Sequence, residues 1–245
     1  MGQAQLHLEL LDFSQNAVSL IYAACRQCYS ARFAAGMFRD GEKEIKKREE
    51  FIRTVVSSGH ESPLEHVKFT FAAEGVSRAL THQLVRHRLA SYSQQSQRYV
   101  KEEDFDYIIP PSIEAQEETK KKYIAVMREI QKNYNSLLKA LEKKNKKGES
   151  ANEDARFILP QASETKIVFT MNCRQLLHFF KERCCSRAQW EIRRLAEEML
   201  KICKKKLPAV FANAGAKCVI LGYCPEGERF TCKRYPTKNK ILGRE

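Results

Sequence analysis

The sequence predicts a single mixed domain of the α/β (α+β) class, with one β-sheet flanked by long helices. The chain has 245 residues, 43% hydrophobic and 30% charged, which is enough apolar content for one sizeable core. Short stretches of alternating hydrophobicity, typical of half-buried strands, stand between longer stretches with helical spacing. No internal repeat and no Pro/Gly/Ser-rich linker divides the chain.

The first elements predicted are a strand and two helices. Alternating leucines indicate a strand at residues 6–10, and Ser14 is expected to cap a helix over residues 15–28. A second helix is predicted over residues 41–58, and the glycine and proline that follow it end it. The apolar stripe of this second helix is Ile45, Ile52, Val55 and Val56.

The central part of the chain changes its periodicity twice. Val67, Phe69 and Phe71 alternate and predict a strand, whereas from Val76 onward the spacing is helical, with Ala79, Leu80 and Leu84 on one face. Residues 91–98 have neither period and are rich in Ser and Gln, so we expect a loop whose backbone can wrap a ligand.

The second half of the chain is predicted to be mainly helical. One long helix, with an acidic start and a basic end, is expected within residues 110–148, ended by Gly148. A strand at 167–171 should lead into a helix over 173–185, capped by Asn172.

The end of the chain is predicted to form one more helix and one more strand. The apolar spacing of residues 188–206 is helical, and residues 218–221 (CVIL) are expected to form a short strand. Beyond them the chain is basic.

Composition and charge limit the class of protein. No apolar run approaches the roughly 18 residues of a membrane span, and the start of the chain lacks the features of a signal peptide, so a cytoplasmic protein is expected. Nine cysteines, an odd number, favour reduced thiols over a disulfide framework. The net charge of +13 lies largely in lysine runs with few aromatic residues between them, which is typical of solvated helix faces. A nucleic-acid-binding module is the alternative reading of this charge.

One polar motif stands out, RHRLASYSQQSQRY at residues 86–99. It holds three arginines and only one leucine and one alanine for packing. Burying an unpaired arginine costs several kcal/mol. The motif is therefore either a solvated face or an anion site, and helical spacing places Gln83, Arg86 and His87 within one turn.

The motif resembles the signature of the flavin-dependent thymidylate synthases: Arg86-His87-Arg88, seven residues, Ser96, then Arg98-Tyr99. Three further blocks are similar to that family and occur in its order. They are GHESPLEHVKFTF before the motif, EDARFILP in the middle and MNCRQLLHFFKERCCSRAQWEI near the end. Four ordered blocks indicate membership more strongly than any single one.

The resemblance implies an enzyme that methylates dUMP to dTMP. The one-carbon unit then comes from methylenetetrahydrofolate, and FAD reduced by NADPH supplies the reducing equivalents. A fold of the thymidylate synthase-complementing type is implied over residues 1–217, in a homotetramer with active sites shared between subunits. Residues 218–245 are left as a basic, cysteine-containing tail. Small molecules are therefore the expected partners, with no nucleic acid and no membrane.

The resemblance also implies residue roles. Expected to hold the flavin are His60, Ser62, Arg86, His87, Arg88, Gln94, Asn172, Arg174 and His178. Expected to bind the nucleotide are Gln83, Leu84, Val85, Arg86, Gln94, Gln95, Ser96, Gln97, Arg98, Arg156 and Arg183. Arg183 is also expected to act in catalysis, by polarising the pyrimidine at N3. A guanidinium suits such roles because it is planar, charged at any working pH and offers paired donors.

The chain departs from the family pattern at three positions. Ser93 and Gln94 stand where Asn-Glu is common, so no carboxylate is available at that point. Gln97 replaces a common glycine, and His178 stands where some members have asparagine.

Alternative chemistries remain open. Cys184 or Cys185 could be a nucleophile activated by nearby arginines, and Ser96 could be one if a base were near. His60 and His66 could form a metal pair, and Cys25 with Cys28 resembles a redox CxxC. The last alternative is a zinc site, for which the ligands would be Cys218, Cys224 and Cys232.

Overall fold

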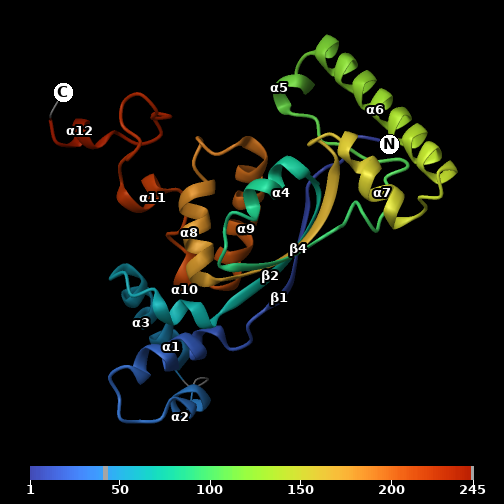
Figure 1. Cartoon of the computed structure of the whole chain (residues 1–245). Coiled ribbons are helices and arrows are strands. Elements are labelled where there is room, and N and C mark those ends of the chain that lie inside the picture. The colour runs from blue at the N-terminus through green and yellow to red at the C-terminus, as the bar shows by residue number, and fades with distance from the viewer. Residues whose placement is uncertain (41–43, 244–245) are drawn as a thin grey trace. The chain divides into compact units, whose positions relative to one another are not determined.

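A computed structural model describes residues 1–40 and 44–243 and confirms the α+β class. Its sheet has four strands in the order β1-β2-β4-β3. The strands are β1 His7–Phe13, β2 Lys68–Ser77, β3 Ala90–Gln94 and β4 Glu164–Asn172. The strands predicted around residues 6–10, 66–74 and 167–171 are thus confirmed (Figure 1).

The register of β2 and β4 is visible in two side-chain contacts. The hydroxyls of Thr70 and Thr170 lie 2.9 Å apart, and the backbone amide of Gly75 donates to the Glu164 carboxylate at 2.8 Å. As residue numbers rise along β2 they fall along β4, so the two strands are antiparallel.

The described residues group into two compact units. Unit 1 comprises Met1–Glu9, Ala72–Arg86 and Tyr92–Val168, and unit 2 comprises Leu10–Phe71, His87–Ser91 and Phe169–Glu245. Each of the four strands belongs partly to one unit and partly to the other. The residues from 218 onward fall in unit 2.

Unit 1 is built around one long helix. Its helices are α4 Arg78–Leu84, α5 Pro111–Glu114, α6 Glu117–Lys143, α7 Glu149–Ala155 and the 3-10 turn η3 Arg156–Ile158. Helices α5, α6 and α7 follow one another and pack together (Figure 1). Tyr134 and Leu138 of α6 are buried against Ala151 and Ala155 of α7.

Unit 2 holds the remaining helices. They are α1 Ala17–Gln27, α2 Ala34–Arg39, α3 Ile45–Ser57, the 3-10 turn η2 Ser62–His66, α8 Cys173–Arg183, α9 Trp190–Lys206, α10 Pro208–Phe211, α11 Lys217–Leu221 and α12 Lys238–Ile241. The helix expected over 41–58 is confirmed as α3, and residues 41–43 lie outside the described part.

The core of unit 2 is aromatic. Phe69 stacks on Phe71 along β2 and meets Phe211 of α10 edge-on, with ring centroids 5.8 Å apart. Phe180 of α8 also packs edge-on against Phe211. All four rings are fully buried, so this cluster holds α8 and α10 together and α10 against β2.

A close backbone approach explains one glycine. Gly75 in β2 has φ +65°, and a Cβ at this position would lie 1.8 Å from the carbonyl oxygen of Gln5. Only glycine fits here, because any side chain would overlap backbone.

Three expected boundaries are wrong. Asn16 in the left-handed conformation, and not Ser14, precedes α1, because Ser14 exchanges hydrogen bonds with Lys68 instead. The expected single long helix is interrupted before α6, where Gln116 is extended. Gly148, with φ +56°, precedes α7 and does not end the long helix, which stops at Lys143.

Two secondary-structure types are also wrong. Residues 90–94 form β3 and are not a loop, because the amide of Gln95 pairs with the carbonyl of Lys166 and extends the ladder with β4. Residues 217–221 form α11 and not a strand; they make no strand pairing in the described chain, and Gly222 in the left-handed conformation ends the helix.

Candidate active site

The arginine-rich motif begins where α4 ends. Ser77 caps α4 by accepting from the amide of Leu80 at 3.0 Å, and Leu80 and Leu84 are fully buried. The chain leaves the helix after Leu84, so Arg86 lies in a turn and is exposed. Its guanidinium contacts the His82 ring at 3.3 Å.

Leu84 and Gln83, two of the predicted nucleotide-binding residues, already form contacts within the protein. The side chain of Leu84 is in the core, and its carbonyl accepts from the hydroxyl of Tyr92 at 2.9 Å. Val85 is 40% exposed and has an accessible side chain. Gln83 donates to the carbonyl of Ala79 at 3.4 Å, within its own helix.

Gln94 is anchored in the sheet. Its amide nitrogen donates to Thr81 Oγ1 at 3.0 Å and to Thr165 Oγ1 at 3.2 Å. Both partners are buried threonines, so the side chain is held at the end of β3. The amide nitrogen suits this position because the Thr81 hydroxyl already donates to the carbonyl of Arg78 at 3.1 Å and therefore accepts here.

The segment after β3 forms a turn around Ser96. Ser96 Oγ accepts from the amide of Arg98 at 3.1 Å, and its carbonyl accepts from the amide of Val100 at 2.9 Å. Gln97 is buried, whereas Arg98 is half exposed and forms ion pairs of 2.7 and 3.0 Å with two carboxylates of α7.

Arg156 lies at the start of η3 in the same unit. Its Nε donates to the carbonyl of Glu153 at 3.3 Å, and no carboxylate of the described chain lies within ion-pair distance of it. Arg78, which sequence patterns did not identify, donates to the carbonyl of Gln95 at 3.4 Å. Burial first, and then the charge of Arg156, lowers the pKa of Arg78, so these two guanidiniums lie near each other.

His87 is the buried member of the motif and belongs to unit 2. The Nε of Arg183 donates to His87 Nε2 at 3.0 Å, and the amide nitrogen of Gln175 contacts Nδ1 at 3.3 Å. Burial first, and then the charge of Arg183, lowers the pKa of His87 to about 4. The ring is therefore neutral at neutral pH and can accept from the guanidinium.

Arg88 differs from its neighbour in being exposed. No carboxylate of the described residues lies within ion-pair distance of it. The Arg88 guanidinium follows the buried His87 in the chain and is free to bind an anionic ligand.

The start of α8 confirms the predicted cap. Asn172 Oδ1 accepts from the amide of Gln175 at 2.8 Å. Arg174, on the first turn, is exposed and paired with Glu65 and Glu61 of the η2 segment. His60 and Ser62 lie in or next to that segment and are exposed.

The capping role of Asn172 gives a stability prediction. Replacing it with alanine should lower the free energy of unfolding by about 1 kcal/mol, because the Gln175 amide loses its acceptor. Asn172→Asp should stay close to the parent, since aspartate caps equally well. Urea unfolding measures both, and equal stability of the alanine and parent chains would contradict the cap.

His178 lies one turn beyond Arg174 on α8. Its ring meets that of His87 edge-on, with centroids 6.0 Å apart. The predicted flavin residues of unit 2 are therefore gathered in two places, His87 with His178 and Arg174 with the η2 segment.

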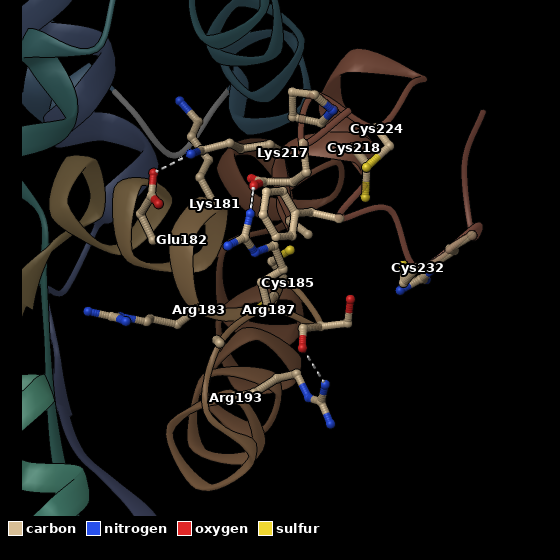
Figure 2. Close-up of a pocket in the computed structure, with 18 of the residues that line it drawn as sticks. Lys181, Glu182, Arg183, Cys185, Arg187, Arg193, Lys217, Cys218, Cys224 and Cys232 are labelled. Carbon is tan, nitrogen blue, oxygen red and sulfur yellow. Dashed lines mark hydrogen bonds and ion pairs between the residues drawn. The ribbon is translucent and has the colours of Figure 1, made fainter. Parts of the chain in front are cut away.

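Arg183 ends α8 and stands at the wall of a pocket of about 430 Å³. In Figure 2 its guanidinium points away from the C-terminal residues of that pocket. Arg187 lies beyond the end of α8 and pairs with Glu226 at 2.8 Å.

The activated-thiol alternative finds little support in the geometry. Burial raises the pKa of Cys184 to about 12, which is the opposite of an activated nucleophile. Cys25 of the CxxC pair is buried, and its pKa is raised to about 11. His60 and His66 belong to no cluster of three or more metal-binding side chains among the described residues.

The chain matches a known protein family. The model of the thymidylate synthase complementing protein family matches residues 9–209. The chain belongs to this family.

Its relatives carry a more particular name. The flavin-dependent thymidylate synthase of Nitratidesulfovibrio vulgaris is 55% identical over 244 residues, covering 98% of this chain and 100% of that protein. The alignment therefore takes in most of residues 218–245. The protein of the same name from Clostridium tetani is 49% identical, over 96% of both chains. The one from Thermococcus onnurineus is 43% identical, over 91% of this chain and 90% of that protein.

No helix within residues 1–40 and 44–243 combines the length and hydropathy of a membrane span. All nine cysteines are described as free thiols.

Proposed function

We propose that the chain is a flavin-dependent thymidylate synthase that methylates dUMP to dTMP. Methylenetetrahydrofolate supplies the carbon unit. NADPH supplies the reducing equivalents by way of FAD. Family membership and the names of the relatives support this. The structural observation that carries it is the hydrogen bond between Arg183 and His87, which joins two blocks of the family pattern that lie 96 residues apart.

The side chains of unit 2 fit an anionic cofactor such as FAD. Arg88 is exposed without a carboxylate partner, and the first turn of α8 presents Arg174 beside the positive end of the helix. His60, Ser62, His87, Asn172 and His178 complete the proposed set in this unit. When bound, the flavin supplies the redox chemistry that side chains lack.

Arg86 and Gln94 of unit 1 are proposed to take part in both flavin and nucleotide binding. Arg86 is exposed, and the described structure gives it a contact only with a histidine ring. Gln94 is fixed by its two threonines and offers its amide oxygen as an acceptor.

The nucleotide is proposed to bind around the turn at Ser96. Arg156 has no carboxylate partner in the described chain, and Arg98 is only half covered by its ion pairs. Two guanidiniums beside a hydroxyl suit a phosphate monoester. The other proposed contacts are Gln83, Leu84, Val85, Gln94, Gln95 and Gln97, with Leu84 limited to its backbone.

Arg183 is proposed to stabilise negative charge on the uracil ring. Its Nε is committed to His87, so its plane is fixed while the terminal nitrogens remain free to donate. A neutral His87 accepts that bond without repelling the guanidinium. Such a preorganised donor is effective because it needs no reorientation when charge develops.

The cellular setting is part of the proposal. We propose a cytoplasmic homotetramer that binds small molecules and neither nucleic acid nor membrane, with residues 1–217 as the synthase domain and 218–245 as a basic tail. Size-exclusion chromatography with light scattering tests the tetramer. A monomer at micromolar concentration would contradict it.

A spectrum tests the function at its first step. Purified protein should be yellow, and dUMP should perturb the flavin absorption in a saturable manner. A colourless protein that cannot be loaded with FAD would contradict the proposal and would favour a thiol enzyme or a nucleic-acid-binding module.

Ser96 is predicted to bind the nucleotide and not to attack it. Ser96→Ala should keep measurable turnover with a raised KM for dUMP, since a neutral hydrogen bond contributes on the order of 1 kcal/mol. Initial-rate kinetics against dUMP measure this. Complete loss of turnover with unchanged dUMP binding would show that Ser96 has a chemical role.

A further inference from the structure

The C-terminal segment, residues 217–243, has almost no core of its own. Only Cys224 and Thr237 are buried within it. Its regular structure consists of α11, five residues long, α12, four residues long, and one isolated bridge between Cys224 and Thr237. Helices this short are unstable alone, and a segment with so little buried apolar surface usually needs a cross-link or a metal ion.

Besides Cys184, four cysteines line the pocket between this segment and the end of α8. Cys218, Cys224 and Cys232 come from the C-terminal segment, and Cys185 comes from the loop between α8 and α9. Figure 2 shows the four around the same pocket. All four are free thiols.

The four thiols are near one another. The pKa of Cys218 is raised by burial and by the neighbouring thiols of Cys185, Cys224 and Cys232. Cys232, in turn, lies beside the side chain of Ser186, the residue next to Cys185. The fourth cysteine is therefore supplied by a loop that is distant in sequence, which the spacing of the other three does not reveal.

We propose that Cys185, Cys218, Cys224 and Cys232 bind one Zn²⁺ ion that fastens the C-terminal segment to the loop between α8 and α9. Four cysteine sulfurs are a common ligand set of structural zinc, which is tetrahedral with Zn–S distances of about 2.3 Å. None of the four cysteines belongs to the proposed flavin-binding or nucleotide-binding residues, so the zinc site stands apart from the proposed function.

The site closes only when the ion binds. No three metal-binding side chains of the described residues already surround a common point. The thiols must therefore turn inward on binding. Cys232 is exposed and lies outside the helices and strands, so its side chain can turn inward, and metal binding is coupled to ordering of the segment.

The charges around the pocket suit such a site. Four thiolates and one Zn²⁺ leave a net charge of −2. The pocket is also lined by the cations Arg187, Arg193, Lys217 and Arg234 and by three carboxylates, of which Glu226 pairs with Arg187 and Glu182 with Lys217. Of these, Arg193 donates only to the carbonyl of Ser186, at 3.3 Å, and no carboxylate of the described chain lies within ion-pair distance of it. Nearby cations favour thiolates over thiols.

Metal analysis of the full chain tests the proposal. The protein is purified without oxygen, loaded with Zn²⁺ and desalted, and its zinc is measured by mass spectrometry. We expect about one ion per chain. Cys218→Ser should lose it, whereas Cys28→Ser, which removes an exposed thiol outside the pocket, should retain it. Equal zinc in the parent and Cys218→Ser chains would overturn the proposal.

Cobalt(II) gives a second readout that does not depend on a folded variant. Added to the metal-free parent chain, it should produce the visible bands of tetrahedral cobalt with thiolate charge transfer. A chelator should speed tryptic cleavage around Arg229 and Lys233 several-fold. A parent chain without these bands, or one whose four cysteines are joined as disulfides after anaerobic purification, would exclude the zinc site.

Discussion

Replacing Arg183 with alanine is expected to slow the chemical step by about 100-fold or more, while flavin binding survives. The physical reason is the loss of a fixed donor where negative charge develops on the pyrimidine, which typically costs about 3 kcal/mol. His87 loses a neighbour but remains neutral, because burial is the first cause of its lowered pKa. The flavin set therefore keeps its shape.

Single-turnover oxidation of pre-reduced enzyme by dUMP and methylenetetrahydrofolate measures this effect. The matched control is Cys184→Ser, next in the chain, which should stay active because partial burial raises the pKa of that thiol to about 12. If Cys184→Ser were inactive while Arg183→Ala turned over normally, a thiol nucleophile would replace the charge-stabilising arginine.

The second large effect is expected for Arg88→Ala, which should raise the dissociation constant for FAD by about 10- to 100-fold. This is the range for losing a hydrogen bond to a charged group. The fold should not suffer, because Arg88 is exposed and no carboxylate of the described chain pairs with it.

Fluorescence titration of the flavin-free chain with FAD measures that constant. Arg128→Ala is the control, since Arg128 is also exposed but lies on α6, outside the proposed site. An Arg88→Ala chain that retains FAD on dilution as well as the parent does would remove Arg88 from the flavin set.

The strands of the core could be predicted because their burial follows a strict alternation. Val67, Phe69 and Phe71 all point into the core, and Ile167, Phe169 and Met171 do the same on β4. The cap at Asn172 was equally visible, since it depends on a residue only three positions away.

Other elements depend on partners that local sequence does not contain. β3 is made of small and polar residues and is a strand only because it pairs with β4 at the edge of the sheet. Residues 217–221 look like a strand by composition, but the described chain offers them no strand partner and they coil into α11.

The candidate site shows the same limit. The arginine-rich motif could be recognised from sequence because it is too polar for a core. The partners of His87 in this motif could not, because Arg183 is 96 residues and Gln175 is 88 residues away in the chain. Arg78 gave no sequence signal of its own, and Gln175 was visible only as part of the cap at Asn172, not as a partner of His87. The family resemblance predicted a role for Arg183, whereas the hydrogen bond that fixes the plane of its guanidinium is known only from the structure.

The most direct test of the central claim is the product of one turnover. The flavin of the purified enzyme is reduced anaerobically with one equivalent of NADPH, and dUMP and methylenetetrahydrofolate are then added together. The account predicts about one dTMP per bound flavin, formed as the oxidised flavin spectrum returns. Return of the oxidised spectrum without dTMP, or dTMP formed by flavin-free protein, would contradict it.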